Sequence, residues 1–374
     1  MELGLKQLIR IGFNTDVVKT SRLPWVDYAK GIAILLVAYR HILIGFDRSG
    51  LAVSLPLMHA NEIFYSFRMP LFFFLSGNFL GGSLVKRGAQ KLLLNKCKTL
   101  LYPYILWAII QITLQILFSK YTNANRSIRD YGYILTKPDA LDQLWYLFAL
   151  FNVALIYIFF KSFVRLRTWQ QIILGIIFHS MSLIFVDGPW HDLLYYYLFY
   201  AIGDALSSFM LNRSLYKYYG SWKVFFILLP LFGISQWYFI HHENIQYTQI
   251  YLFAVVALIG CAFMLNICFK MQQWGKMRFL QIVGYHSLYI YVMHVMIVSA
   301  FRSFFVNIVH INSVPLLLVI NLILGMALSI IIYNICLRSG LWFMFGLDRS
   351  RVLIPKMKSP GVAKSARQNV VASL

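Results

Sequence analysis

Long apolar runs divide most of this chain, and short polar stretches separate them. The first run, residues 25–46, follows Pro24, which suits the start of a helix because its missing N–H has no partner there. About 20 residues at 1.5 Å rise cross the hydrocarbon core of a bilayer, so each run predicts one transmembrane helix. The nine further segments are 62–81, 99–118, 141–160, 169–186, 193–210, 222–240, 247–268, 279–301 and 314–337. The predicted fold class is all-α, a polytopic membrane bundle of about ten helices.

Four polar side chains interrupt the first run: Asp27, Lys30, Arg40 and His41. At about 100° per residue, Lys30 and His41 differ by about 20° around the helix axis, and Asp27 lies about 40° from His41. These three residues therefore form one polar stripe, along which Lys30 and His41 are roughly 16 Å apart. An ionisable group in hydrocarbon costs at least about 2.5 kcal/mol, so the stripe is expected to face a cavity. A purely structural alternative is a local Asp27–Lys30 ion pair with His41 bonded to another helix.

The composition supports a membrane protein. The chain has 374 residues, of which 60% are hydrophobic and 13% charged, against roughly 25% charged residues in soluble domains. Its formal net charge is +21, and the Lys and Arg residues gather in the loops after even-numbered runs and beyond residue 338. The positive-inside rule then predicts that both termini are cytoplasmic. Topology and anionic lipid headgroups explain the charge, so no nucleic-acid partner is expected.

The polar stretches also suggest the domain organisation. Residues 1–22 are expected to form a cytoplasmic or interfacial segment, residues 23–340 the membrane domain, and residues 341–374 a basic, disordered cytoplasmic tail. The four cysteines have no metal-like spacing, so we predict neither a disulfide framework nor a metal site.

Other polar residues within apolar runs are candidates for the same site. In the derived orientation Arg68, two residues before Pro70, lies roughly 10 Å below the outer surface, and His41 lies at roughly 7 Å. His294 in the ninth run reaches a comparable depth. The structural alternatives are that Arg68 snorkels to the outer surface and that His294 only bonds a neighbouring helix.

Two further groups lie at the membrane edges. Trp145 and Tyr146, just inside the outer end of the fourth run, could stack on a sugar or act as interfacial anchors. At the cytoplasmic edge, Lys96 and Lys98 join Lys30 as cations that could hold a phosphate-bearing ligand. The positive-inside rule alone also accounts for these lysines.

Several of these residues belong to motifs that resemble the membrane acyltransferase family 3, and within it the fucose 4-O-acetylase-related branch. The motifs are Asp27-Tyr-Ala-Lys30-Gly31 with His41 beyond it, Phe67-Arg68-Met69-Pro70-Leu-Phe-Phe-Phe-Leu-Ser76-Gly77, Lys98-Thr-Leu-Leu-Tyr-Pro103-Tyr104, Leu144-Trp145-Tyr-Leu, and Gly284-Tyr-His-Ser287-Leu-Tyr-Ile-Tyr291-Val-Met-His294. Two positions depart from the family pattern: Lys30 stands where many members have Arg, and Arg68 where this branch often has His.

The resemblance implies a ten-helix bundle that takes an acyl group, commonly acetyl, from cytoplasmic acyl-CoA. It implies delivery to a sugar hydroxyl of a surface polysaccharide, such as an exopolysaccharide, or of a lipid-linked oligosaccharide. The absence of a disulfide framework or an appended soluble domain is compatible with a bacterial inner membrane. Membrane lipids and the glycan are then the expected partners, acetyl-CoA is the expected donor, and no metal is needed.

On this interpretation Lys30, with Lys96 and Lys98, holds the donor phosphates, while Asp27, Ser76 and Gly77 orient the site. His41 acts as general base on the acceptor hydroxyl, a role that suits an ordinary histidine pKa of about 6.5. Arg68 or His294 stabilises the oxyanion that develops on the thioester carbonyl. An acyl-histidine relay through His41 is an equally open route.

Two hypotheses from other classes compete with the enzyme. A transporter or flippase for a lipid-linked sugar would use the polar stripe as a passage, and a catalytically inactive scaffold would keep the fold without turnover. The transporter does not explain the spacing of Lys30 and His41 on one helix face, and Arg68 in place of a histidine favours the scaffold.

Overall fold

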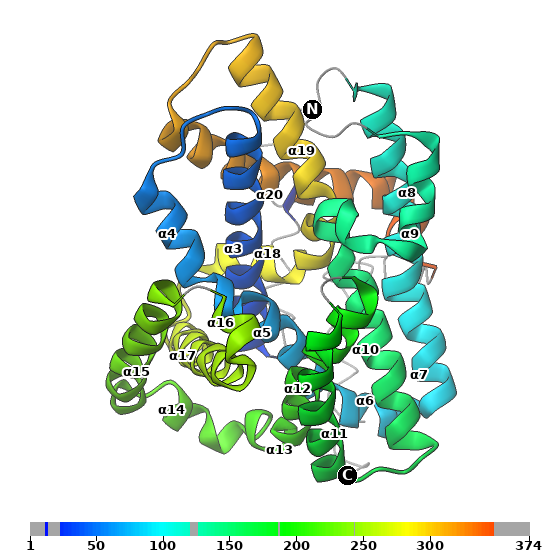
Figure 1. The fold of residues 1–374 in the computed structure, drawn as a ribbon, viewed down its shortest axis with the longest axis vertical. Coiled ribbons are helices and arrows are strands. Elements are labelled where there is room, and N and C mark those ends of the chain that lie inside the picture. The colour runs from blue at the N-terminus through cyan, green and yellow to red at the C-terminus, as the bar shows by residue number, and fades with distance from the viewer. Residues whose placement is uncertain (1–11, 14–22, 120–125, 186–187, 243, 348–374) are drawn as a thin grey trace, which may run out of the picture.

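The computed structural model describes residues 12–13, 23–119, 126–185, 188–242 and 244–347. These residues form helices joined by turns, with no β-strand among them (Figure 1). In chain order, with 3₁₀ and π segments labelled η, the elements are α3 (Pro24–Arg48), α4 (Leu55–Ile63), α5 (Tyr65–Asn78), α6 (Leu80–Arg87), α7 (Ala89–Lys96), η1 (Cys97–Leu101), α8 (Tyr102–Leu117), η3 (Ile128–Gly132), α9 (Tyr133–Thr136), η4 (Pro138–Leu144), α10 (Trp145–Ser162), α11 (Thr168–Met181), η5 (Ser182–Ile184), α12 (Pro189–Ala205), α13 (Ser207–Met210), η6 (Arg213–Leu215), α14 (Tyr216–Tyr219), α15 (Trp222–His241), α16 (Ile245–Thr248), α17 (Ile250–Trp274), α18 (Arg278–Tyr285), α19 (Ser287–Asn307), α20 (Val314–Arg338) and η7 (Trp342–Met344).

Eight helical segments within the described residues have the length and composition to cross a membrane. They are Pro24–Arg48, Leu55–Arg87, Ala89–Leu117, Pro138–Ser162, Trp222–His241, Ile250–Trp274, Ser287–Asn307 and Val314–Arg338. The fifth and sixth predicted runs correspond to α11 and α12, which are shorter than these eight. The all-α polytopic bundle is therefore confirmed.

Several predicted helices are interrupted in the structure. The second run is part of three helices, α4, α5 and α6, with breaks at Phe64 and Phe79. The ninth run breaks at His286, between α18 and α19. A π turn at η1 joins α7 to α8, and π turns are frequent at functional sites. Apolar periodicity alone does not reveal such breaks because every piece remains apolar.

The ends of the chain fall mostly outside the described residues. This holds for the predicted interfacial segment 1–22, apart from residues 12–13, and for the predicted tail beyond residue 347. The first part of that tail is ordered and packs on the bundle. The Trp107 indole donates a hydrogen bond to the carbonyl oxygen of Met344 at 2.9 Å, and Phe345 is buried against Trp107 and Tyr333.

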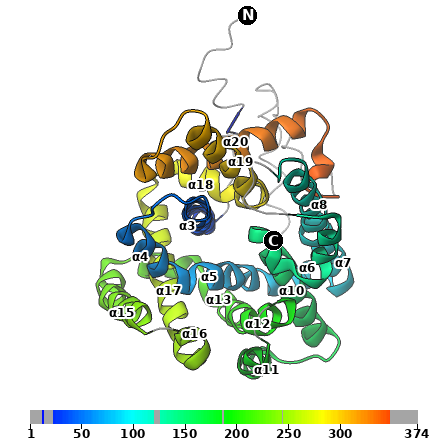
Figure 2. The same ribbon diagram turned by 45° about the horizontal axis from the view of Figure 1, so that its top comes forward.

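Helix α3 lies inside the bundle and carries the predicted polar stripe. In Figures 1 and 2 it stands between α18, α19 and α20 on one side and α4 and α5 on the other, and α17 also packs on it. Its largest side chains, among them Trp25, Tyr28 and Phe46, have no exposed surface. Because other helices cover α3 on several sides, Asp27, Lys30 and His41 are half-buried, whereas Asp47 and Arg48 at the end of the helix are exposed.

Two glycines bring α3 and α18 into backbone contact. A Cβ atom on Gly31 would overlap the carbonyl oxygen of Leu280, and a Cβ atom on Gly284 would overlap that of Asp27. Small residues allow helices to approach this closely in membranes, where packing replaces the hydrophobic effect as the driving force. The glycines of the first and last motifs are therefore packing residues that fix the start of α3.

A second reciprocal contact joins α5 to α12. A Cβ atom on Gly77 would overlap the carbonyl oxygen of Tyr200, and one on Gly203 would overlap that of Phe74. Gly77, expected to orient the site, thus sets the position of the helix that carries Arg68.

Gly203→Ala is expected to destabilise the protein by about 1–3 kcal/mol, because the new methyl group has no space against the α5 backbone. The matched control is Gly233→Ala in α15, where no atom lies within 4 Å of the position that the new methyl group would take. Thermal unfolding of both purified variants measures the difference. Equal midpoints would contradict the close α5–α12 contact.

Candidate active site

Two cavities meet at His41. Cavity 1, of about 510 Å³, lies between α3, α8, η4 and α19, and cavity 2, of about 320 Å³, lies between α3, α5, η4, α10 and α12. His41, Ile44, Arg48 and Asp142 line both of them. His41 is half-buried, so its ring is part of the wall that the two cavities share.

The structure places His294 directly beside His41. Their ring centroids are 5.4 Å apart in an edge arrangement, and His294 is fully buried. Nδ1 of His294 lies 3.0 Å from the carbonyl oxygens of both Ile290 and Tyr291. Because both partners are acceptors, Nδ1 carries the proton, and Nε2 of the neutral ring is then an acceptor. Nε2 has no hydrogen-bond partner among the described residues.

Arg68 points into the protein and lines cavity 2. It is 3% exposed, and its guanidinium donates to the carbonyl oxygen of Leu36 at 3.1 Å and to Oδ1 of Asn61 at 3.3 Å. Arg68 and Arg40 both lie over the Tyr65 ring, at 5.9 Å and 5.2 Å from its centroid. The snorkelling alternative for Arg68 does not describe this geometry. His41 and Arg68, 27 positions apart in sequence, therefore share one cavity.

Cavity 2 combines aromatic rings with acidic groups. Its lining includes Tyr65, Trp145, Tyr195, Tyr196 and Tyr247 together with Asp139, Asp142, Asp192 and Gln246. Flat apolar faces beside hydrogen-bonding groups suit a ligand that is itself both apolar and hydroxylated.

Trp145 and Tyr146 do not act as a pair. Trp145 lines cavity 2, whereas Tyr146 lines neither cavity and packs against Phe73 and Tyr291. Ser76, an expected orienting residue, lies within hydrogen-bonding reach of the Tyr146 hydroxyl. Adjacent residues of a helix point about 100° apart, which explains why Trp145 faces cavity 2 and Tyr146 does not.

Lys30 and Lys96 come together near the start of α3. The two ammonium groups interact electrostatically, and Lys30 also interacts with Asp27. Lys98, two residues further along the chain within η1, is exposed, and none of the three lysines lines either cavity. The structure thus divides the predicted site residues between two ends of α3, with the lysines at one and His41 at the other.

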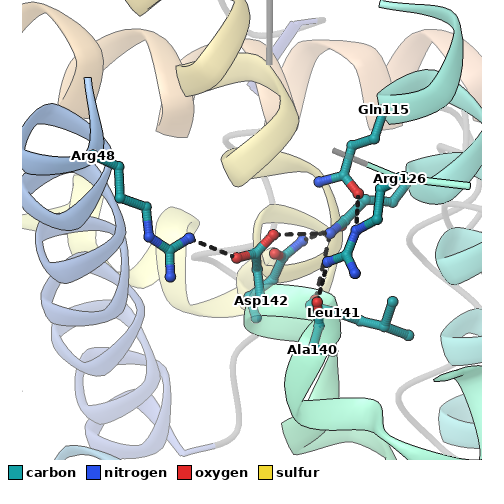
Figure 3. Close-up of polar contacts among 8 residues, drawn as sticks. Arg48, Gln115, Arg126, Ala140, Leu141 and Asp142 are labelled. Atoms are coloured by element: carbon teal, nitrogen blue, oxygen red, sulfur yellow. Dashed lines mark hydrogen bonds and ion pairs between the residues drawn. The ribbon is translucent and has the colours of Figure 1, made fainter. Parts of the chain in front are cut away.

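The structure adds a polar network that the sequence reasoning missed (Figure 3). Arg48 pairs with Oδ1 of Asp142 at 3.3 Å, and Nε2 of Gln111 lies 3.4 Å from Oδ2 of the same carboxylate. Asp142 has φ 51° and ψ −114°, a backbone conformation that L-residues rarely adopt and that often marks functional sites. In the sequence, Arg48 and Asp142 are ordinary charges at the ends of apolar runs.

Nearby, Arg126 holds the segment before Asp142. Its guanidinium donates to the carbonyl oxygen of Ala140 and to the side chain of Gln115, as Figure 3 shows. Tyr291 from α19 donates to the carbonyl oxygen of Gln143. Asp142, the residue with positive φ, is therefore held by contacts from both α8 and α19.

Comparison with known proteins gives one match. No curated protein and no solved structure matches the chain. The model of the acyltransferase domain family 3 matches residues 23–334, which contain both cavities and the lysine cluster. The chain therefore belongs to the membrane acyltransferase family 3.

Proposed function

We propose that this acyltransferase is an O-acetyltransferase that moves the acetyl group of acetyl-CoA to a sugar hydroxyl of a surface polysaccharide or a lipid-linked glycan. The observation that carries the proposal is the place of His41, on the wall between two cavities and against a buried histidine. A base in that position can meet donor and acceptor arriving from different directions. The resemblance to the fucose 4-O-acetylase-related branch supports acetyl as the transferred group and a sugar as the acceptor.

His41 is the proposed general base. It takes the proton of the acceptor hydroxyl while the oxygen attacks the thioester carbon, and the proton then passes to the sulfur of CoA as the C–S bond breaks. His294 acts through His41, because its Nε2 is an acceptor that can receive an N–H of the His41 ring. This role replaces the expected oxyanion contact of His294, since a neutral ring with Nδ1–H bonded to backbone has no donor left.

Arg68 is the proposed oxyanion donor. Its guanidinium is held by Leu36 and Asn61 at fixed positions and faces cavity 2. Fixed donors in a water-poor site stabilise developing negative charge without reorganisation. The acyl-histidine route uses the same residues, with His41 as nucleophile.

The lysine cluster is the proposed donor end. Lys30, Lys96 and Lys98 hold the phosphates of acetyl-CoA at the cytoplasmic side, with Asp27 orienting Lys30. The roughly 16 Å between Lys30 and His41 suits an extended pantetheine arm. On this proposal the protein lies in a bacterial inner membrane with both termini in the cytoplasm.

Cavity 2 is the proposed acceptor site. Trp145 and its tyrosine neighbours offer stacking faces, and the acidic groups accept hydrogen bonds from sugar hydroxyls. A flippase would need the same binding surface, but it would not need the buried His294 packed against His41 beside that surface.

His41→Ala is expected to lower acetyl transfer by about 100-fold or more, because the base is lost. The assay follows CoA release from acetyl-CoA by the purified full chain with its glycan acceptor. The control is His59→Ala, an exposed histidine of α4, which keeps wild-type transfer. Undiminished transfer by a folded His41→Ala variant would overturn the proposed role.

Lys30→Met is expected to raise the KM for acetyl-CoA about tenfold with little change in kcat, since a phosphate contact is lost away from the reacting atoms. Lys30→Arg should restore the KM because it keeps the cation. Lys217→Met, which removes an exposed lysine of α14, is the control. A fall in kcat at unchanged KM would place Lys30 at the chemistry instead.

A further inference from the structure

Cavity 1 contains a buried arginine that has no hydrogen-bond or ion-pair partner among the described residues. Arg302 lies on α19, is 5% exposed and lines this cavity. Its guanidinium lies over Gly45 of α3, where a Cβ atom would overlap it. In the part of the chain that the structure describes, Arg302 makes no hydrogen bond and no ion pair, and it interacts with Asp142 only at longer range.

The charge around Arg302 is not balanced. Arg48, Arg302 and Asp142 are the charged residues of the lining, with His41 taken as neutral, which gives cavity 1 a net charge of +1. The Asp142 carboxylate is already engaged by Arg48 and by Gln111. A buried cation in a membrane protein is costly unless something pairs with it, so Arg302 favours an anionic ligand in cavity 1.

The other walls of cavity 1 combine polar side chains, such as Gln115 and Asn307, with apolar side chains that reach the surface of the bundle. Leu114 and Phe118 on the α8 side, with Phe304 and Ile308 on the α19 side, line the cavity and are between 37% and 68% exposed. Apolar side chains exposed on a membrane bundle face hydrocarbon. The cavity therefore places the buried Arg302 guanidinium near apolar side chains that lead outward to the surface of the bundle.

We propose that cavity 1 binds the phosphate and part of the hydrocarbon chain of a lipid-linked substrate, with Arg302 as the phosphate-binding residue. A guanidinium matches a phosphate through two parallel hydrogen bonds. His41, Arg48 and Asp142 border cavity 2 as well, so a sugar carried on that phosphate would reach cavity 2 past His41. The identity of this ligand as the acetyl acceptor rests on the proposed function. The binding of an anionic amphiphile in cavity 1 does not depend on that function.

Binding of dodecyl phosphate to the full chain in detergent tests the site, with dodecanol and inorganic phosphate as partial ligands. Native mass spectrometry should show dodecyl phosphate bound at least about tenfold more tightly than either. Arg302→Met should remove this preference and Arg302→Lys should keep most of it. Arg129→Met, an exposed arginine of η3, is the matched control.

A second variant tests the apolar part of the cavity without touching the charge. Ala300 lines cavity 1, so Ala300→Phe should weaken dodecyl phosphate binding, whereas Ala300→Ser should not. The binding assay contains no acetyl-CoA and follows no acetyl transfer, so its result does not depend on the catalytic proposal. The site is overturned if Arg302→Met binds normally or if dodecanol binds as well as the phosphate. Equally tight, Arg302-dependent binding of phosphatidylglycerol would assign cavity 1 to a bilayer lipid and overturn the substrate role.

Discussion

The cost of placing ionisable side chains in a bilayer governs the arrangement of this protein. Asp27, Lys30 and His41 lie on one face of a helix that is itself covered by other helices, and backbone contact at Gly31 and Gly284 fixes the start of that helix. Because other helices pack around α3, His41 meets two cavities, whereas Asp27 and Lys30 lie beside each other near the start of the helix. The same constraint explains why the charges deep in the bundle stand beside partners or openings.

The site depends on two neighbours of α3 that are distant in sequence. α19 brings His294 to His41, and α5 brings Arg68 into the same cavity. Both neighbours begin at breaks in longer predicted runs, His286 and Phe64. The breaks let each helix take its own direction, which a continuous transmembrane helix would not allow. Tertiary packing thus decides which polar residues of separate helices meet.

The site residues that could be predicted from the sequence are the polar residues that stand within otherwise apolar runs. His41, Arg68 and His294 are polar residues within apolar runs; His41 and Arg68 line a cavity, and His294 packs against His41. Arg302 lay one residue beyond the predicted end of its helix and looked like a loop charge, but α19 continues to Asn307 and buries it. The sequence also could not show that Trp145 lines cavity 2 and Tyr146 does not, because the rotation of a helix about its axis depends on the helices packed around it. Sequence periodicity predicted ten apolar segments, of which eight correspond to helical segments long enough to cross a membrane, but it did not reveal the breaks within them.

Mass spectrometry of surface glycans tests the central claim most directly. The samples are cells with the intact chain, cells without it, and cells with His41→Ala at normal membrane levels. The account predicts that one ester-sized mass disappears equally from the two altered strains while the amount of glycan stays the same, and the mass difference identifies the acyl group. Loss of glycan without loss of esters would contradict the account and favour a flippase.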